Sequence, residues 1–300
     1  MLTIAYITSR EEPKIEWFFD SLHRECLGNY EGIKVVVVDS LAPREFPLVS
    51  AEFVHVKPKP CVWQGEFRKT RKDYWAKCNA ANTALCYAPD GWISFMDDIS
   101  VLAPGWLVRV KKAMQRPTTL CLGSFKKVKD LNVDDGKILS FTEFPPGVDS
   151  RWDSGSDTSP VVASGSWMYG HVTGPVEAFL SVNGYPEALC DSLSFEDCIC
   201  GIRLQNSGYM FRYDRQMLVY ESEELHHESK RHAVRFDKGV SPNDKSHAAL
   251  KRVMSGDFSI WNGYDLRRLR ESIRRGGEFP VPTEPTTDWF DGQPIHEIDL

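Results

Sequence analysis

The chain has 300 residues, of which 42% are hydrophobic and 26% are charged, and its formal net charge is -6. This composition is typical of a soluble globular protein, and the length fits one large domain or one domain with an appendage. The negative charge excludes a protein that binds polyanions with its whole surface. No apolar run approaches the roughly 20 residues of a membrane-spanning helix, and the first residues lack the flanks of a signal peptide.

The cysteines indicate the compartment. There are eight, scattered along the chain, and none forms a Cys-x-x-Cys pair. We therefore expect no zinc knuckle or redox motif. Scattered cysteines also indicate a reducing environment. We predict a cytoplasmic protein without an integral membrane segment, so that any membrane association is peripheral, at the membrane surface.

Strands and helices alternate along the first hundred residues. Apolar runs predict strands at 2–8, 34–39, 52–56 and 92–96, and helical spacing predicts helices at 13–26 and 70–88. Such alternation is typical of a mostly parallel, doubly wound sheet. We therefore predict an α/β fold.

The pattern is less regular after residue 100. Helices are predicted at 104–114, 174–184 and 195–207, and strands at 119–125, 161–173, 209–212 and 217–220. Residues 130–160 are rich in Gly, Pro, Ser and Asp, which favours a hairpin and a mobile loop.

The C-terminal segment differs in charge from the rest. Residues 226–276 contain twelve Lys and Arg against six acids. Two helices are predicted there, at 243–254 and 263–275, before an acidic, Pro-rich end. One hypothesis is that Arg267, Arg268, Arg274 and Arg275 form an acceptor or membrane-surface patch; a solvated helix face is the alternative.

Two adjacent carboxylates, Asp97 and Asp98, follow the strand at 92–96. Open α/β sheets bind their ligands at the carboxyl ends of the strands. Neighbouring carboxylates repel one another unless a positive charge lies beside them, and a divalent cation carrying a diphosphate meets that need. Capping of the following helix by one Asp is the alternative.

A second acidic pair, Glu196 and Asp197, opens the helix predicted at 195–207. Carboxylates at a helix start gain from the helix dipole, which is one explanation for them. The other is catalytic, because a carboxylate close to a hydroxyl can accept its proton as the oxygen attacks.

Two further groups have the chemistry of a binding site. His226 and His227 follow an acidic run, and neutral imidazole is a common metal ligand. Lys77, Asn79 and Asn82 lie in a small-residue stretch that leads to the acidic strand, where a cation can neutralise phosphates.

In their order and spacing, these pieces resemble the glycosyltransferases of the GT-A fold, above all family 2. The resemblance covers residues 2 to about 227. It is carried by the strand ending in Thr8-Ser9-Arg10, the strand ending in Asp39, the helix 76–84, the run Phe-Met-Asp-Asp-Ile-Ser-Val-Leu-Ala-Pro-Gly-Trp-Leu, the segment 182–186 and the segment 195–209.

The resemblance implies a fold and a division of the chain. It implies a Rossmann-like nucleotide-binding sheet flanked by helices, with a small C-terminal helical extension. Residues 1–228 would form the catalytic domain, with a nucleotide-binding half at about 1–100 and an acceptor half at 101–228. Residues 229–300 would form the basic helical extension and the acidic tail.

The resemblance also implies a role for individual residues. Thr8, Ser9, Arg10, Asp39, Lys77, Asn82 and Asp97 would bind the nucleotide. Asp98 and Asp97 would bind the metal, Asp98 being the better candidate for a direct ligand, and His227 or His226 would join them. Asp197, beside Glu196, would be the catalytic base.

The implied activity is a metal-dependent, inverting transfer of a sugar. The cofactor would be Mn²⁺ or Mg²⁺, and the donor a UDP-, GDP- or dTDP-sugar. The acceptor would offer a hydroxyl on a glycan, a lipid-linked carrier or a nucleic acid. One departure concerns Ile99, because many relatives have a further Asp at this position.

Two other classes of protein remain as alternatives. A nucleotidyltransferase has a similar sheet, but the segment after the first strand is short and acidic and lacks a Gly-rich phosphate loop. A catalytically impaired protein that binds glycans or nucleic acid would be consistent with Ile99.

Overall fold

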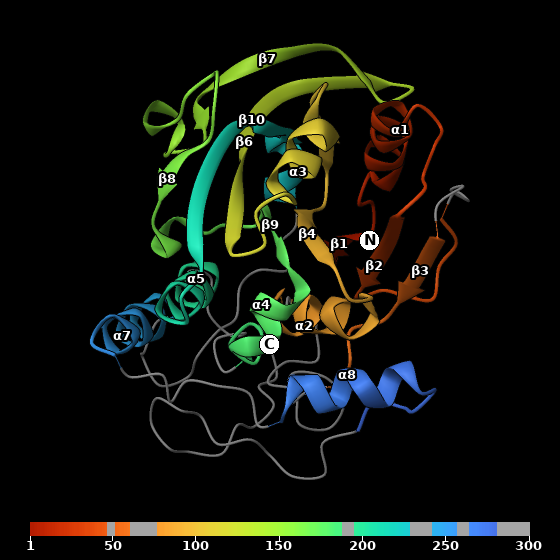
Figure 1. Ribbon diagram of the computed structural model, residues 1–300. Coiled ribbons are helices and arrows are strands. Elements are labelled where there is room, and N and C mark those ends of the chain that lie inside the picture. Colours follow the sequence, from red (N-terminus) through yellow and green to blue (C-terminus); the bar gives the residue numbers. More distant parts are fainter. Residues whose placement is uncertain (47–51, 61–76, 188–194, 229–241, 257–263, 281–300) are drawn as a thin grey trace.

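The computed structural model describes residues 1–46, 52–60, 77–187, 195–228, 242–256 and 264–280. Within them, a ten-stranded mixed sheet is flanked by eight α-helices. The prediction of an α/β fold is therefore confirmed. Figure 1 shows the sheet passing through the middle of the molecule, with helices on both sides.

One half of the sheet is parallel. It consists of β1 (Leu2–Thr8), β2 (Ile33–Asp39), β3 (Glu52–Val56) and β4 (Trp92–Asp97), in the order β3-β2-β1-β4. β1 and β2 are buried along nearly their whole length, as their continuous apolar sequences predict. Because these strands are parallel, their carboxyl ends meet at one edge of the sheet.

The other half of the sheet reverses direction at one strand. β9 (Val172–Pro175) lies antiparallel between β4 and β6 (Thr119–Asp134), and β10 (Met210–Ser222) is parallel to β6. Because β9 is antiparallel to both β4 and β6, β6 and β10 run in the same direction as β4. The carboxyl ends of β6 and β10 therefore lie at the same edge of the sheet as Asp97.

Helices cover both faces of the sheet. α1 (Ile15–Cys26) and α3 (Trp106–Ala113) bury Phe18 and Trp106 in the core on one face. The core on the other face includes side chains from four helices, which are α2 (Lys77–Tyr87), α4 (Val176–Ser181), α5 (Glu196–Asn206) and α8 (Leu266–Arg274).

Several elements differ from the sequence prediction. Residues 119–148 form one long hairpin of β6 and β7 (Lys137–Val148). A hairpin was expected within 130–160, but β6 continues beyond the expected strand end at 125. The strands expected at 209–212 and 217–220 are the single strand β10, with an irregularity between Tyr213 and Leu218. β5 (Ser100–Leu102) and β8 (Val161–Ala163) pair with β10.

Tertiary contacts explain the long hairpin. Its turn contains Gly136, where any Cβ would overlap with the backbone of Asp20 and Ser21 in α1. The turn therefore lies directly against α1, and Figure 1 shows the hairpin arching over to that helix. Local composition does not reveal this support.

The C-terminal segment is partly integrated into the fold. α7 (Pro242–Met254) packs on α5, and α8 contributes the buried Leu266 and Leu269 to the core that contains α2. The α8 cations are largely paired: Arg267 with Glu177, and Arg274 with Asp90. These pairs reduce the charge available to the hypothetical basic patch on this helix. Residues 281–300, predicted to be extended, lie outside the described residues.

Candidate active site

The two strand-tip carboxylates have different surroundings. Asp97 ends β4 and lies near Lys77, whereas Asp98 is buried and contacts the segment after β1. Ile99 follows with a left-handed backbone (φ 55°), and its N–H donates to the Pro13 carbonyl at 3.1 Å and the Tyr6 hydroxyl at 3.2 Å. The structure thus separates two side chains that the sequence presents as one pair.

Asp98 is engaged by the segment that follows β1. Its carboxylate accepts hydrogen bonds from Thr8 Oγ1 and from Arg10 Nε, each at 2.8 Å. Burial raises the pKa of Asp98 to about 6, although Arg10 and Thr8 oppose this rise. Arg10 Nη1 also donates to the Leu225 carbonyl at 2.6 Å, so Asp98 and Arg10 connect β1 and β4 to α6 (Glu223–Glu228).

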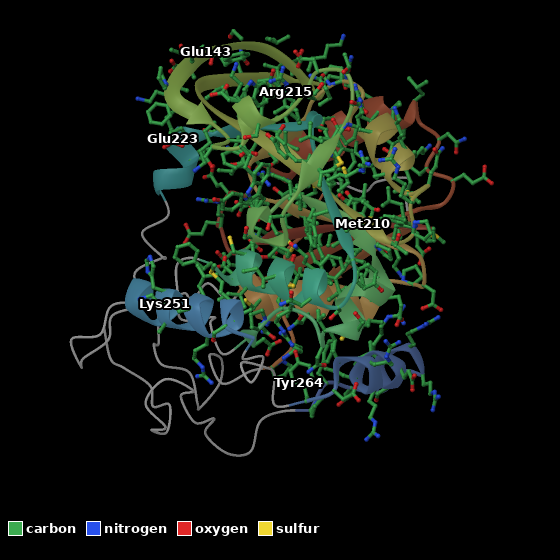
Figure 2. The ribbon with its side chains drawn as sticks, turned by 60° about the vertical axis from the view of Figure 1, so that its left-hand side comes forward. Glu143, Met210, Arg215, Glu223, Lys251 and Tyr264 are labelled. Carbon is green, nitrogen blue, oxygen red and sulfur yellow. The ribbon has the colours of Figure 1, made fainter. Side chains whose placement is uncertain are left out.

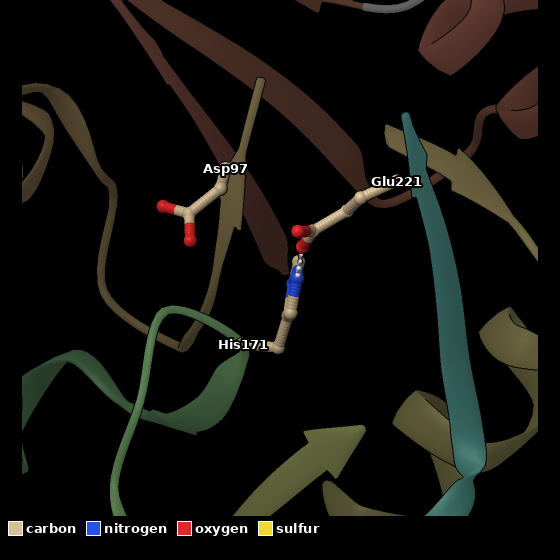
Figure 3. A group of neighbouring side chains, drawn as sticks. All are labelled: Asp97, His171 and Glu221. Carbon is tan, nitrogen blue, oxygen red and sulfur yellow. Dashed lines mark hydrogen bonds and ion pairs between the residues drawn. The ribbon is translucent and has the colours of Figure 1, made fainter. Parts of the chain in front are cut away.

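Asp97, His171 and Glu221 form a group with the geometry of a metal site (Figure 3). Ligand atoms of the three side chains all lie within 4.8 Å of one another. His171 Nε2 lies 2.9 Å from Glu221 Oε1, while His171 Nδ1 is buried without a hydrogen-bond partner among the described residues. Imidazole with two carboxylates is a donor set that suits Mn²⁺. These residues therefore fit the cation that the fold implies.

This group differs from the metal site predicted from the sequence, and both remain candidates. Asp97, and not the favoured Asp98, contributes to it, because both Asp98 oxygens are directed to Thr8 and Arg10. His171 and Glu221 were missed. A single histidine after an aromatic-glycine segment has no distinguishing pattern, and Glu221 is one acid in an acidic run.

The close approach of the chain to Asp97 explains the glycine before His171. A Cβ at Gly170 would overlap with the Asp97 carboxylate. Glycine is the residue that permits a backbone to come this near. Gly170 therefore allows β9 and the preceding loop to hold His171 beside the end of β4.

Lys77 connects the two acidic motifs. Its Nζ lies 3.0 Å from Asp197 Oδ2 and 3.4 Å from Asp97 Oδ1. Burial disfavours the charged lysine, but Asp197, Asp97 and Glu196 outweigh burial and hold the pKa of Lys77 well above its ordinary value. The first turn of α2 thus places an ammonium group between the end of β4 and the start of α5.

Glu196 and Asp197 are both buried acids with raised pKa values. Burial first, and then the neighbouring Asp197, raise the pKa of Glu196 to about 7. Burial raises the pKa of Asp197 as well, although Lys77 opposes this. Asp197 Oδ1 and Glu196 Oε2 are buried and have no hydrogen-bond partner among the described residues. A carboxylate oxygen without a partner is available to a substrate hydroxyl.

Asp39 lies close to the predicted nucleotide residues but is occupied by protein groups. Thr8 and Asp39 are opposite one another in the β1–β2 register. The fully buried Asp39 carboxylate accepts hydrogen bonds from Arg44 Nε at 2.6 Å and Nη2 at 2.9 Å, and His55 Nε2 is 3.1 Å away. Ser9 is buried next to Thr8.

Asn82 has a structural environment. It is fully buried, and its amide nitrogen contacts the Tyr185 carbonyl, Glu187 and the Tyr264 hydroxyl, while its oxygen accepts from the Tyr185 N–H. Asn82 is thus occupied by protein groups in this structure, and its nucleotide contact stays a prediction. Asn79 is likewise fully buried.

His226 and His227 lie in α6, but their side chains are outside the described part of the structure. Their predicted role in metal binding remains a prediction.

The fold and the site define a class of protein. A family model for glycosyl transferase family 2 matches residues 3–171, more than half of the chain. The chain belongs to this family, and its membership confirms the predicted glycosyltransferase class. Among curated proteins, none matches the chain.

Solved structures agree with this assignment. The crystal structure of GalNAc-T7 with UDP, GalNAc and Mn²⁺ is similar with a TM-score of 0.58 and 10% identity, over 95% of this chain and 60% of that one. S. aureus TarS 1-349 with UDP-GlcNAc is similar with a TM-score of 0.54 and 10% identity, over 99% of both chains. A longer TarS chain has a TM-score of 0.51 and 12% identity, over 87% of this chain and 44% of that one. At identities this low, the structural similarity shows the shared GT-A fold and no more.

One observation concerns membranes. None of the helices in the described part of the chain combines the length and the apolar composition that a bilayer crossing requires.

Proposed function

We propose that this protein is a metal-dependent, inverting glycosyltransferase that moves a sugar from a UDP-, GDP- or dTDP-sugar to an acceptor hydroxyl. The observation that carries the proposal is the shared position of Asp97 and Asp197 around Lys77. This arrangement brings a candidate metal ligand and a candidate base within reach of one substrate.

We assign the metal site to Asp97, His171 and Glu221, with Mn²⁺ or Mg²⁺ as the cofactor. Such a cation stabilises the negative charge that develops on a leaving diphosphate. The group also weakens the rival hypothesis of a catalytically impaired binding protein, which rested on Ile99. Ile99 cannot bind a metal, but Asp97, His171 and Glu221 provide three candidate ligands without a carboxylate at that position.

Asp197 is the proposed base. It accepts the proton of the acceptor hydroxyl as the oxygen attacks the anomeric carbon from the face opposite the diphosphate. The bond from that carbon to the diphosphate oxygen breaks, so the configuration is inverted. Lys77 lowers the pKa of Asp197 against the effect of burial and thereby favours the basic form.

The nucleotide would occupy the edge of the sheet at the ends of β1 and β2. Thr8, Ser9, Arg10 and Asp39 remain its proposed contacts, with Lys77 near the diphosphate. Arg44 donates two hydrogen bonds to the Asp39 carboxylate in this structure. A nucleotide contact with Asp39 would therefore require Arg44 to give up at least one of these bonds.

The acceptor and the cellular location remain proposals of the same kind. We retain a glycan, a lipid-linked carrier or a nucleic acid as sources of the hydroxyl. A cytoplasmic protein with peripheral membrane contact is consistent with the unpaired thiols of Cys26, Cys86, Cys121, Cys198 and Cys200.

Substitution of the base tests the proposal. Asp197→Asn should abolish sugar transfer and donor hydrolysis, while a thermal-shift assay with nucleotide sugars and Mn²⁺ should still detect donor binding. Glu177→Gln, which neutralises an exposed carboxylate on α4, is the matched control and should transfer normally. Full activity of Asp197→Asn would contradict the assignment of the base.

The donor screen tests the class itself. We expect one of the UDP-, GDP- or dTDP-sugars to stabilise the protein when Mn²⁺ is present, and Asp97→Asn to lose this stabilisation. Stabilisation by glycans alone, with no hydrolysis of any nucleotide sugar, would favour the binding protein instead.

A further inference from the structure

A pocket lies at the edge of the sheet opposite the candidate active site. It is a small hollow beneath α3, where β6 and β10 begin, and it opens to solvent. Four cationic side chains and one acid are among its lining residues, which are Arg109, Lys112, Ala113, Arg116, Thr119, Cys121, Pro160, Arg212 and Asp214.

The cations converge from separate parts of the chain. Arg109 and Lys112 belong to α3, Arg116 to the loop after it, and Arg212 to β10, where it pairs in register with Cys121 of β6. Burial raises the pKa of the Cys121 thiol to about 12 and Asp214 adds to this, while Arg116, Arg212 and Arg109 oppose it. The side chains of all three arginines line this one pocket.

The pocket has an excess of positive charge. Its only acid, Asp214, is 3.7 Å from Arg109 and accepts a hydrogen bond from the Gln216 N–H. Arg212 donates to the neutral Pro160 carbonyl. Lys112 and Arg116 have no carboxylate partner among the residues that the structure describes. A bound anion would supply the missing negative charge.

Helix electrostatics account for only part of this arrangement. Cations in the last turn of a helix interact favourably with its dipole, which explains Lys112. This effect does not explain Arg212, which comes from the sheet.

The position of the pocket separates it from catalysis. β6 and β10 run parallel to β4, so their first residues lie at the edge opposite Asp97. Along β6, Cys121 lines the pocket and Lys127 lies opposite Glu221; the six residue steps from Cys121 to Lys127 span about 20 Å. A ligand here does not compete with a nucleotide sugar at the active site.

Exposed apolar side chains border the pocket. Val162 of β8 pairs with Arg212, and Met210 is two residues before Arg212, so both share its face of the sheet. Val162 is 78% exposed and Met210 60% exposed. Figure 2 shows Met210 at the start of β10. Cations beside exposed apolar groups are suited to the surface of an anionic membrane, as well as to a soluble phosphate.

We propose that this pocket is a second binding site, which takes the phosphate group of a phosphorylated ligand, either a soluble phosphate ester or a lipid headgroup. The inference does not depend on the proposed transferase activity, since none of the lining residues belongs to the candidate active site.

Binding measurements with two probes test the site. The full chain is titrated with glycerol phosphate, and separately with phosphatidylcholine vesicles that contain or lack phosphatidylglycerol, in EDTA so that the metal site is empty. The test variant is Lys112→Gln/Arg116→Gln, which removes two exposed cations without a carboxylate partner. The control is Lys137→Gln/Lys251→Gln, which removes the same charge from two exposed positions outside the pocket.

The expected result is salt-dependent binding of at least one probe that the test variant weakens by about 30-fold and the control does not. If the source is a lipid, Met210→Ser/Val162→Ser should weaken vesicle binding alone. If it is a soluble ester, glycerol phosphate should bind and the apolar substitutions should have no effect. Failure of both probes to bind, or equal weakening by the test and control variants, would overturn the proposal.

Discussion

At the scale of single residues, Lys77 is the group that makes two acidic motifs into one site. Asp97 and Asp197 are a hundred residues apart in the sequence, yet both contact its ammonium group. Because Asp197 is buried and Lys77 and Asp97 are only partly exposed, solvent screens their mutual charges incompletely. Their protonation states therefore depend on one another.

This dependence predicts the pH profile of a Lys77 variant. Lys77→Met removes the charge that opposes the rise in the Asp197 pKa, so that pKa should increase further. The acid limb of kcat/KM should then move to higher pH by about 1–3 pH units. Lys77→Arg, which keeps the charge, should retain the original limb. An unchanged profile in Lys77→Met would show that Asp197 is not the titrating base.

Gly170 gives a second prediction at this scale. Gly170→Ala should displace the Asp97 carboxylate, because a Cβ would overlap with it. We expect Mn²⁺ affinity, measured by titration calorimetry, to fall by about 10–100-fold. In a double-mutant cycle, Gly170→Ala should add little to Asp97→Asn. Additive effects would mean that the glycine acts elsewhere.

At the scale of elements, the sequence analysis succeeded where neighbours in the chain determine the structure. The strands at 2–8 and 52–56 and the start of α5 follow from apolar runs and helix-start residues. It predicted a hairpin within 130–160 but missed the length of β6 and β7, whose turn rests on α1. A composition rich in Gly and Pro does not reveal how far strands extend when the supporting helix is more than a hundred residues away.

The contact between α2 and α8 leads to a prediction for Asn82. This residue bridges Tyr185, Glu187 and Tyr264, the last of which precedes α8. Asn82→Ala removes the hydrogen bonds that its amide makes to these groups, among them both bonds to the Tyr185 backbone, and should lower the free energy of unfolding by about 1–3 kcal/mol. Denaturant titration would measure this loss.

Donor affinity distinguishes the structural role from the original prediction. Under native conditions, Asn82→Ala should bind a nucleotide sugar as the wild type does. Loss of donor binding without loss of stability would support the original prediction that Asn82 contacts the nucleotide.

At the scale of the whole molecule, buried acids make stability depend on pH. Glu196 has an ordinary pKa near 4.5 and a pKa of about 7 in the fold. Between these values the folded state holds more protons than the unfolded state, so the free energy of unfolding from this group falls as pH rises. Asp98, with a pKa raised to about 6, acts in the same direction.

Substitution of Glu196 by its neutral isostere tests this linkage. Glu196→Gln should increase the free energy of unfolding by about 1–3 kcal/mol at pH 8, relative to wild type, and change it little at pH 4. Denaturant titrations in EDTA at the two pH values would measure both effects. An equal change at both pH values would point to packing and not to ionisation.

The sequence by itself determined the α/β class, the family and the acidic motifs, because apolar periodicity and short-range spacing are properties of neighbouring residues. Only the tertiary structure decided that Asp97 faces His171 and Glu221 while Asp98 faces Arg10. It also decided that Asn82 is buried, and that cations from α3 and β10 share a pocket. These outcomes depend on which strands and helices pack together, and that packing joins residues whose separation along the chain leaves no local pattern.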